Sequence, residues 1–83
     1  MTNERKRVEK FCNIRGGAEF REAIQVMRMI GYEIIRMHGS HFIFESLIHK
    51  EAENITIPVH HNKIKKIYVK RIQKLIKLYY EKI

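Results

Sequence analysis

The spacing of apolar residues along the chain predicts three helices. Between residues 4 and 15 apolar side chains recur at intervals of three and four, and Gly16-Gly17 ends the segment. A clearer amphipathic pattern runs through residues 18–30 and stops at Gly31. A third and longer helix is predicted over residues 64–81. Its apolar stripe consists of Ile64, Tyr68, Ile72, Leu75, Ile76 and Tyr79.

Between the second and third helices the apolar period changes to two, which predicts three strands. Residues 32–37 and 41–45 form two of them, joined by a tight Gly39-Ser40 turn into a hairpin. Residues 55–59 form the third, near an edge or an end because Pro58 cannot donate to a ladder. The order helix–helix–strand–strand–strand–helix predicts an α+β, two-layer sandwich. Helices cover one face of a three-stranded antiparallel sheet, and the other face stays open.

Length and charge narrow the classes of function. The 83 residues suffice for one domain, and 45% hydrophobic content argues against disorder. The net charge is +8. Residues 63–83 hold eight lysine or arginine residues and one acidic residue, so nearly all of the excess lies in the last quarter. This distribution favours a polyanionic partner, either nucleic acid or an anionic membrane face.

The cysteine content and the apolar runs exclude other classes. A single Cys excludes an intramolecular disulfide framework and a Cys-rich zinc site. No apolar run reaches the roughly 18 residues of a membrane span, and the N-terminus lacks the apolar region of a signal peptide. We therefore expect a soluble, cytoplasmic chain with no membrane partner.

His41 is the candidate catalytic residue. Alternation places His41 on the open face of the sheet together with Ile43, whereas Phe42 and Phe44 point toward the helices. A histidine on an exposed strand face beside a glycine turn is not needed for packing. Its imidazole can accept or donate a proton near neutral pH, as general acid–base catalysis requires.

Cationic residues could hold phosphate groups near this histidine. Arg36 alternates with Tyr32 and Ile34, so we expect the three on the same exposed face, where Tyr32 could stack on a base. Phosphate contact and simple solvation explain Arg36 equally well. A lysine cluster at the start of the last helix is the preferred phosphate-binding group, because helix N-termini also favour anions. The cluster consists of Lys63, Lys65, Lys66 and Lys70.

The spacing of the histidines disfavours a metal site. Zinc sites in proteins combine three or four ligands at recognisable spacings, which these histidines lack. We expect no metal and no other cofactor. The histidines considered are His38, His41, His60 and His61. His60 could also be a second acid–base group, although an ordinary residue at a strand end is the simpler interpretation.

Two segments carry a resemblance to a known family. RMHGSHFIF at residues 36–44 and ITIPVH at residues 55–60, followed by YVK in the last helix, are similar to the HicA toxins. That family shows a helix, a strand, a G-S-H-x-x-F turn and strand, a strand ending in proline and histidine, and a basic helix. These parts occur in order from about Phe20 to Ile76. Residues 1–17 would be an N-terminal helical extension and residues 18–83 the HicA-like domain.

The resemblance implies a double-stranded-RNA-binding-domain-like fold and a ribonuclease that cleaves single-stranded mRNA without a metal. It implies that His41 is catalytic and that Gly39 and Ser40 form the supporting turn. Gly39 would let the RNA backbone approach, and Ser40 would bond the turn in preference to a phosphate. It also implies a HicB-like antitoxin as partner. Two alternatives stay open: a non-catalytic RNA-binding domain of the same fold, and a protein-interaction module indifferent to His41.

Overall fold

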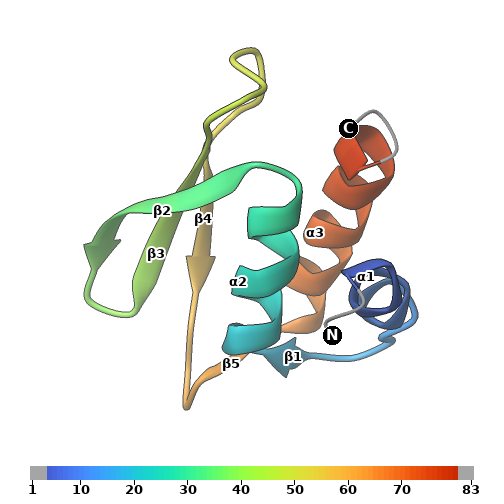
Figure 1. Cartoon of the computed structure of the whole chain (residues 1–83). Helices are drawn as coiled ribbons and strands as arrows, with labels where there is room; N and C mark the ends of the chain where they lie inside the picture. Colours follow the sequence, from blue (N-terminus) through green and yellow to red (C-terminus); the bar gives the residue numbers. More distant parts are fainter. Residues whose placement is uncertain (1–3, 81–83) are drawn as a thin grey trace.

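One antiparallel sheet with helices packed on a single face forms the body of the protein (Figure 1). This computed structural model describes residues 4–80. The sheet has the order β2-β3-β4, formed by Tyr32–His38, His41–Ser46 and Ile55–Pro58. The main covering helices are α2 (Phe20–Met29) and α3 (Lys66–Tyr79). The α+β prediction is confirmed, and the arrangement is consistent with a double-stranded-RNA-binding-domain-like fold. Pro58 ends the edge strand β4, as predicted.

A single hydrophobic core lies between the sheet and the helices. The helical spacing of α2 buries Ala23 and Met27, and that of α3 buries Ile72 and Ile76. From the sheet, Phe44 is fully buried against them. Within residues 4–80, no helix combines the length and the apolar character needed to cross a membrane.

A second, two-stranded sheet replaces the predicted first turns of two helices. Strands β1 (Ala18–Glu19) and β5 (Lys63–Ile64) pair antiparallel, with Ala18 opposite Ile64. Helix α2 therefore begins at Phe20 and not at residue 18, and α3 begins at Lys66 and not at residue 64. The predicted end of the last helix at residue 81 lies outside the described residues. A Cβ at Gly17 would lie 2.6 Å from the Ile64 carbonyl oxygen, so glycine permits this close approach of the two segments.

Helix α1 (Glu4–Cys12) is shorter than the predicted 4–15 and belongs to the same core. It packs against α2 and α3, on the helical side of the sheet (Figure 1). Val8 and Phe11 are buried there. The Gln73 side-chain amide, on α3, donates hydrogen bonds to the carbonyl oxygens of Phe11 (3.0 Å) and Ile14 (2.9 Å). These bonds satisfy carbonyl groups at and just beyond the end of α1, before the Gly16-Gly17 pair is reached. A division of the chain at residue 17 stays a prediction.

We expect Gln73→Ala to accelerate the alkylation of Cys12 several-fold. Burial raises the pKa of the Cys12 thiol, and the nearby Lys77 ammonium opposes this effect only in part. Little reactive thiolate is therefore present in the folded chain, and alkylation reports opening of the end of α1. Iodoacetamide labelling at pH 8, followed by mass spectrometry, measures the rate. Lys74→Ala is the matched control on the same helix. Equal rates in Gln73→Ala and the control would show that the amide does not hold the helix end.

Candidate active site on the open face of the sheet

His41 is the first residue of β3, directly after a two-residue turn. Gly39 has φ +58°, a backbone conformation that other residues adopt at a cost, so the turn favours glycine there. The backbone carbonyl of Ser40 accepts a hydrogen bond from the Val59 amide (2.8 Å). This bond ties the turn to the residue that follows β4, which fixes the backbone from which the His41 side chain projects. A role of the Ser40 side chain stays a prediction.

The imidazole of His41 lies on the face of the sheet that the helices do not cover. His41 is exposed, whereas Phe44 is fully buried and Phe42 is half-buried on the opposite face. The rings of Phe20 and Phe42 lie 4.5 Å apart, so α2 packs directly behind the strand that carries His41. The predicted orientation of this strand matches the structure.

A β-bulge in β2 decides which residues share the face of His41. The pairing shifts between Ile34, which lies opposite Phe44, and Arg36, which lies opposite Ile43. Ile35 is the extra residue, so every side chain after it changes face relative to simple alternation. Arg36 is therefore exposed on the open face, whereas Tyr32 and Ile34 belong to the core face.

The expectation that Tyr32 and Ile34 share the face of Arg36 was thus wrong. Tyr32 is 0% exposed, and its hydroxyl donates to the Glu53 carbonyl oxygen at 3.4 Å. Burial raises the pKa of this hydroxyl, with a further contribution from the neighbouring Tyr79. Tyr32 packs the core and cannot stack on a base from the open face.

The register brings a second histidine and an arginine to His41. His38 pairs directly with His41 across the hairpin, and both are exposed. Cβ atoms of such a pair lie about 4.5–5.5 Å apart. Arg36 is the diagonal neighbour, about 7–8 Å away by the same geometry, which a guanidinium can span. On β4, Pro58 lies opposite His41. The open face therefore offers two imidazoles and one permanent cation within reach of a single phosphate group.

His38 was not among the predicted site residues, although the sequence contained the signal. In the segment His38-Gly39-Ser40-His41, a two-residue turn places the two flanking residues opposite each other. Recognising that turn type predicts the pair of histidines.

The predicted lysine cluster lies in a different part of the fold from Arg36. Lys63 belongs to β5, Lys65 precedes α3, Lys66 begins it, and Lys70 lies one turn further on. All four are exposed. Lys63 pairs with His60 through two backbone hydrogen bonds of 2.9 Å, next to the end of β4. For the part of the chain described, no three His, Cys, Asp or Glu side chains are grouped so as to hold a metal ion.

Comparison with known proteins identifies the family. The profile of the HicA toxins of bacterial toxin–antitoxin systems matches residues 20–78, from the start of α2 nearly to the end of α3. This range contains the hairpin, His41 and the four lysines, whereas α1 lies before it. Searches of curated proteins and of solved structures gave no match. With the family match over most of its length and the predicted fold in place, the chain belongs to the HicA toxin family.

Proposed function

We propose that this toxin is a metal-independent endoribonuclease that cleaves single-stranded mRNA, with His41 as the catalytic base. HicA toxins are generally mRNA interferases, which supports the reaction class. The observation that carries the proposal is the exposed His41 imidazole beside the Gly39-Ser40 turn, with His38 and Arg36 on the same face. Neither imidazole is needed to fill the core, because both lie on the uncovered side of the sheet.

The reaction is an internal transesterification. His41 takes the proton from a ribose 2′-hydroxyl, and the resulting 2′-oxygen attacks the adjacent phosphorus. The P–O5′ bond breaks as the 2′-O–P bond forms, and the leaving 5′-oxygen receives a proton. The products are a 2′,3′-cyclic phosphate and a free 5′-hydroxyl.

Neighbouring residues have distinct roles in this proposal. His38, opposite His41, is placed to protonate the leaving oxygen. The Arg36 guanidinium offsets negative charge that develops on the phosphate. A Cβ built on Gly39 meets no atom within 4 Å, so the turn is open on that side and lets the RNA backbone come close. Lys63, Lys65, Lys66 and Lys70 supply salt-dependent phosphate contacts outside the reacting group.

A HicB-like antitoxin is the proposed protein partner, in line with the toxin–antitoxin family. The open face that carries His41 is the surface it would cover. An exposed apolar side chain at the bulge of β2, Ile35 (49% exposed), could be buried by such a partner.

The decisive experiment compares two matched RNA substrates in EDTA. The purified chain is incubated with a labelled single-stranded RNA, and the cleaved position is mapped. We expect cleavage in EDTA with cyclic phosphate ends, and no cleavage of the same RNA carrying one 2′-deoxyribose at the mapped position, because the nucleophile is missing. Cleavage of the deoxy substrate, or activity that EDTA abolishes, would contradict this mechanism. Binding without cleavage would favour a non-catalytic RNA-binding domain.

A further inference from the structure

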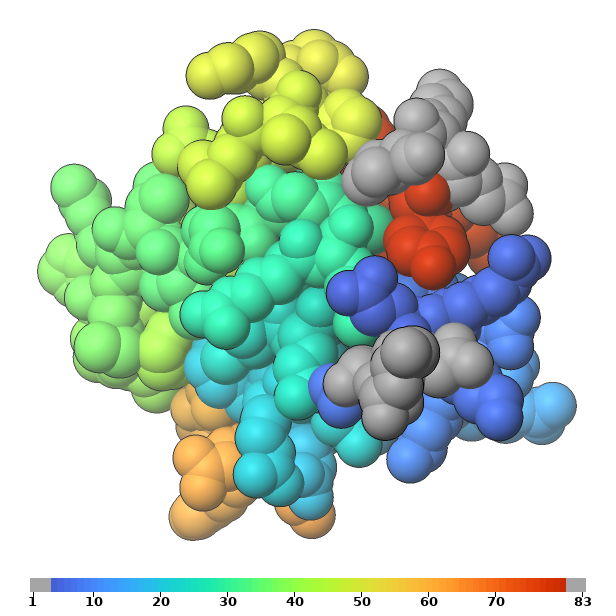
Figure 2. Space-filling model, in the orientation of Figure 1, coloured from blue at the N-terminus to red at the C-terminus, as the bar shows by residue number. Residues whose placement is uncertain are grey.

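A surface hollow lies beside the hairpin, between the first turn of α2 and the turn that precedes β5. Its volume is about 520 Å³. The two segments that form it lie next to each other at the lower edge of the molecule in Figure 2. It is lined by Glu19, Phe20, Arg21, Ile24, His61, Asn62 and Lys63.

Backbone hydrogen bonds fix the walls of this hollow. His61 (φ 53°) and Asn62 (φ 64°) both have left-handed backbone conformations and form a two-residue turn between His60 and Lys63. The carbonyl oxygen of Asn62 accepts a hydrogen bond from the Phe20 amide (2.8 Å). The turn is therefore bonded to the start of α2, and the hollow is preformed.

The same walls are connected to the active-site hairpin. Phe20 packs on Phe42, the residue after His41. On the other side, the Val59 amide bonds to the carbonyl of Ser40, the residue before His41. The hollow is thus connected to both chain neighbours of His41, although no hairpin residue lines it. A strand of RNA would have to pass around the end of the hairpin to reach it from the open face.

The lining matches the chemistry of a nucleotide. Ile24 and the small exposed part of Phe20 (9%) contribute apolar surface. Asn62 offers an amide that can bond a base edge, and Arg21 and Lys63 are exposed cations for a phosphate. Arg21 also contacts Glu19 at 3.8 Å, but both side chains are highly exposed, so this ion pair is weak and exchangeable. A volume of this size is typical of small-ligand sites.

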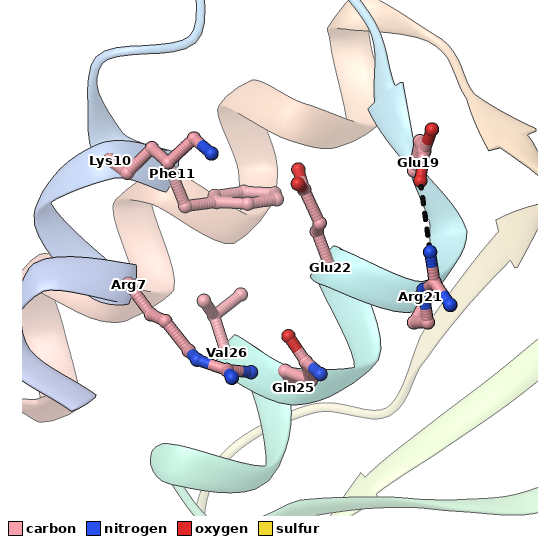
Figure 3. Close-up of a pocket in the computed structure, with 8 residues that line it drawn as sticks. All are labelled: Arg7, Lys10, Phe11, Glu19, Arg21, Glu22, Gln25 and Val26. Carbon is pink, nitrogen blue, oxygen red and sulfur yellow. Dashed lines mark ion pairs between the residues drawn. The ribbon is translucent and has the colours of Figure 1, made fainter. Parts of the chain in front are cut away.

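A second hollow, between α1 and α2, shares Glu19 and Arg21 with the first. Figure 3 shows Arg7 and Lys10 of α1 facing it together with Glu22 of α2. Its volume is about 330 Å³, and its lining includes two carboxylates, Glu19 and Glu22. Of these two hollows, Arg7 and Lys10 line only the second, so they provide a control.

We propose that the hollow between α2 and the His60–Lys63 turn binds one nucleotide of the RNA substrate, outside the scissile position. The base lies against Phe20 and Ile24, and its phosphate contacts Arg21 and Lys63. This inference rests on the proposed ribonuclease function and assigns the subsite that positions the RNA relative to His41.

The first test is RNA binding in a His41→Ala background, in which the proposed function leaves the RNA intact. Fluorescence anisotropy with a 12-nucleotide single-stranded RNA gives the dissociation constant between 50 and 200 mM salt. We expect Arg21→Ala/Lys63→Ala to weaken binding about tenfold. The slope of the logarithm of the binding constant against the logarithm of the salt concentration should become shallower by about 1.4, because two phosphate contacts are lost. Arg7→Ala/Lys10→Ala removes the same charge from the other hollow and should change the slope by less than half as much. Equal effects of the two double variants would overturn the inference.

The second test keeps the hollow unaltered and so does not depend on the folding of a variant. The His41→Ala chain is crosslinked to RNAs that carry one 4-thiouridine at successive positions, and the attached peptides are identified by mass spectrometry. We expect one position to label residues 20–24 or 60–63. Labels confined to other segments overturn the inference, even where the wild-type chain cleaves RNA. If residues 20–24 or 60–63 are labelled but the wild-type chain cuts no RNA, the subsite is supported and the ribonuclease proposal is overturned.

Discussion

His41→Ala is expected to slow RNA cleavage by about 10²–10⁴-fold, the usual contribution of general acid–base catalysis. The side chain is exposed on the open face, so its removal opens no cavity and leaves the fold unchanged. Single-turnover cleavage of a labelled single-stranded RNA in EDTA measures the rate. RNA binding of the same variant should retain its salt dependence, because the proposed phosphate contacts come from arginine and lysine side chains that the substitution leaves in place.

Thr56→Ala is the matched control for this prediction. Thr56 is exposed on the same face, opposite Ile43, and no role in the reaction is proposed for it. It should cleave at the wild-type rate. His38→Ala should show an intermediate rate, because water can replace a missing acid. A His41→Ala chain that cleaves as fast as Thr56→Ala would remove the basis for the proposed mechanism.

Phe11→Ala is expected to lower the free energy of unfolding by about 3–5 kcal/mol, the range for a buried phenylalanine in a packed core. Phe11 is only 2% exposed and shares one cluster with residues of α2, α3 and the sheet. Since small domains are stable by only about 5–15 kcal/mol, this one change would remove much of the total. Urea unfolding followed by circular dichroism measures the effect.

Lys10→Ala, on the exposed side of the same helix, should change the stability by less than about 0.5 kcal/mol. A loss below about 1 kcal/mol for Phe11→Ala would mean that α1 contributes little to the folded core. An unfolding curve with two transitions would mean that α1 detaches before the rest. Either result would support the division at residue 17 as a boundary in stability.

The type of most elements, and the face of His41, could be predicted because they depend on local periodicity. Alternation in residues 41–45 is regular, and both phenylalanines of β3 lie on the core side as predicted. The helical spacing in α2 and α3 was equally clear. These patterns express one buried and one exposed side, which a short sequence window can show.

The predictions failed where pairing between distant segments overrides local pattern. Strands β1 and β5 have two residues each, too short for any period, and their pairing joins segments more than forty residues apart. The bulge leaves no signature of its own in β2, so the side chains of Tyr32 and Arg36 were placed on one face. The contact of Gln73 with the end of α1 likewise depends on tertiary packing.

The bulge at Ile35 also bears on how relatives of this chain are aligned. A strand with that single residue deleted would alternate without interruption and would still direct Tyr32 inward and Arg36 outward. The strand thus tolerates a length change of one residue at this point without disturbing the row that holds His38. A family member one residue shorter here should therefore be aligned with its gap at position 35, because a gap placed at Met37 would align a residue of the helical face with Arg36.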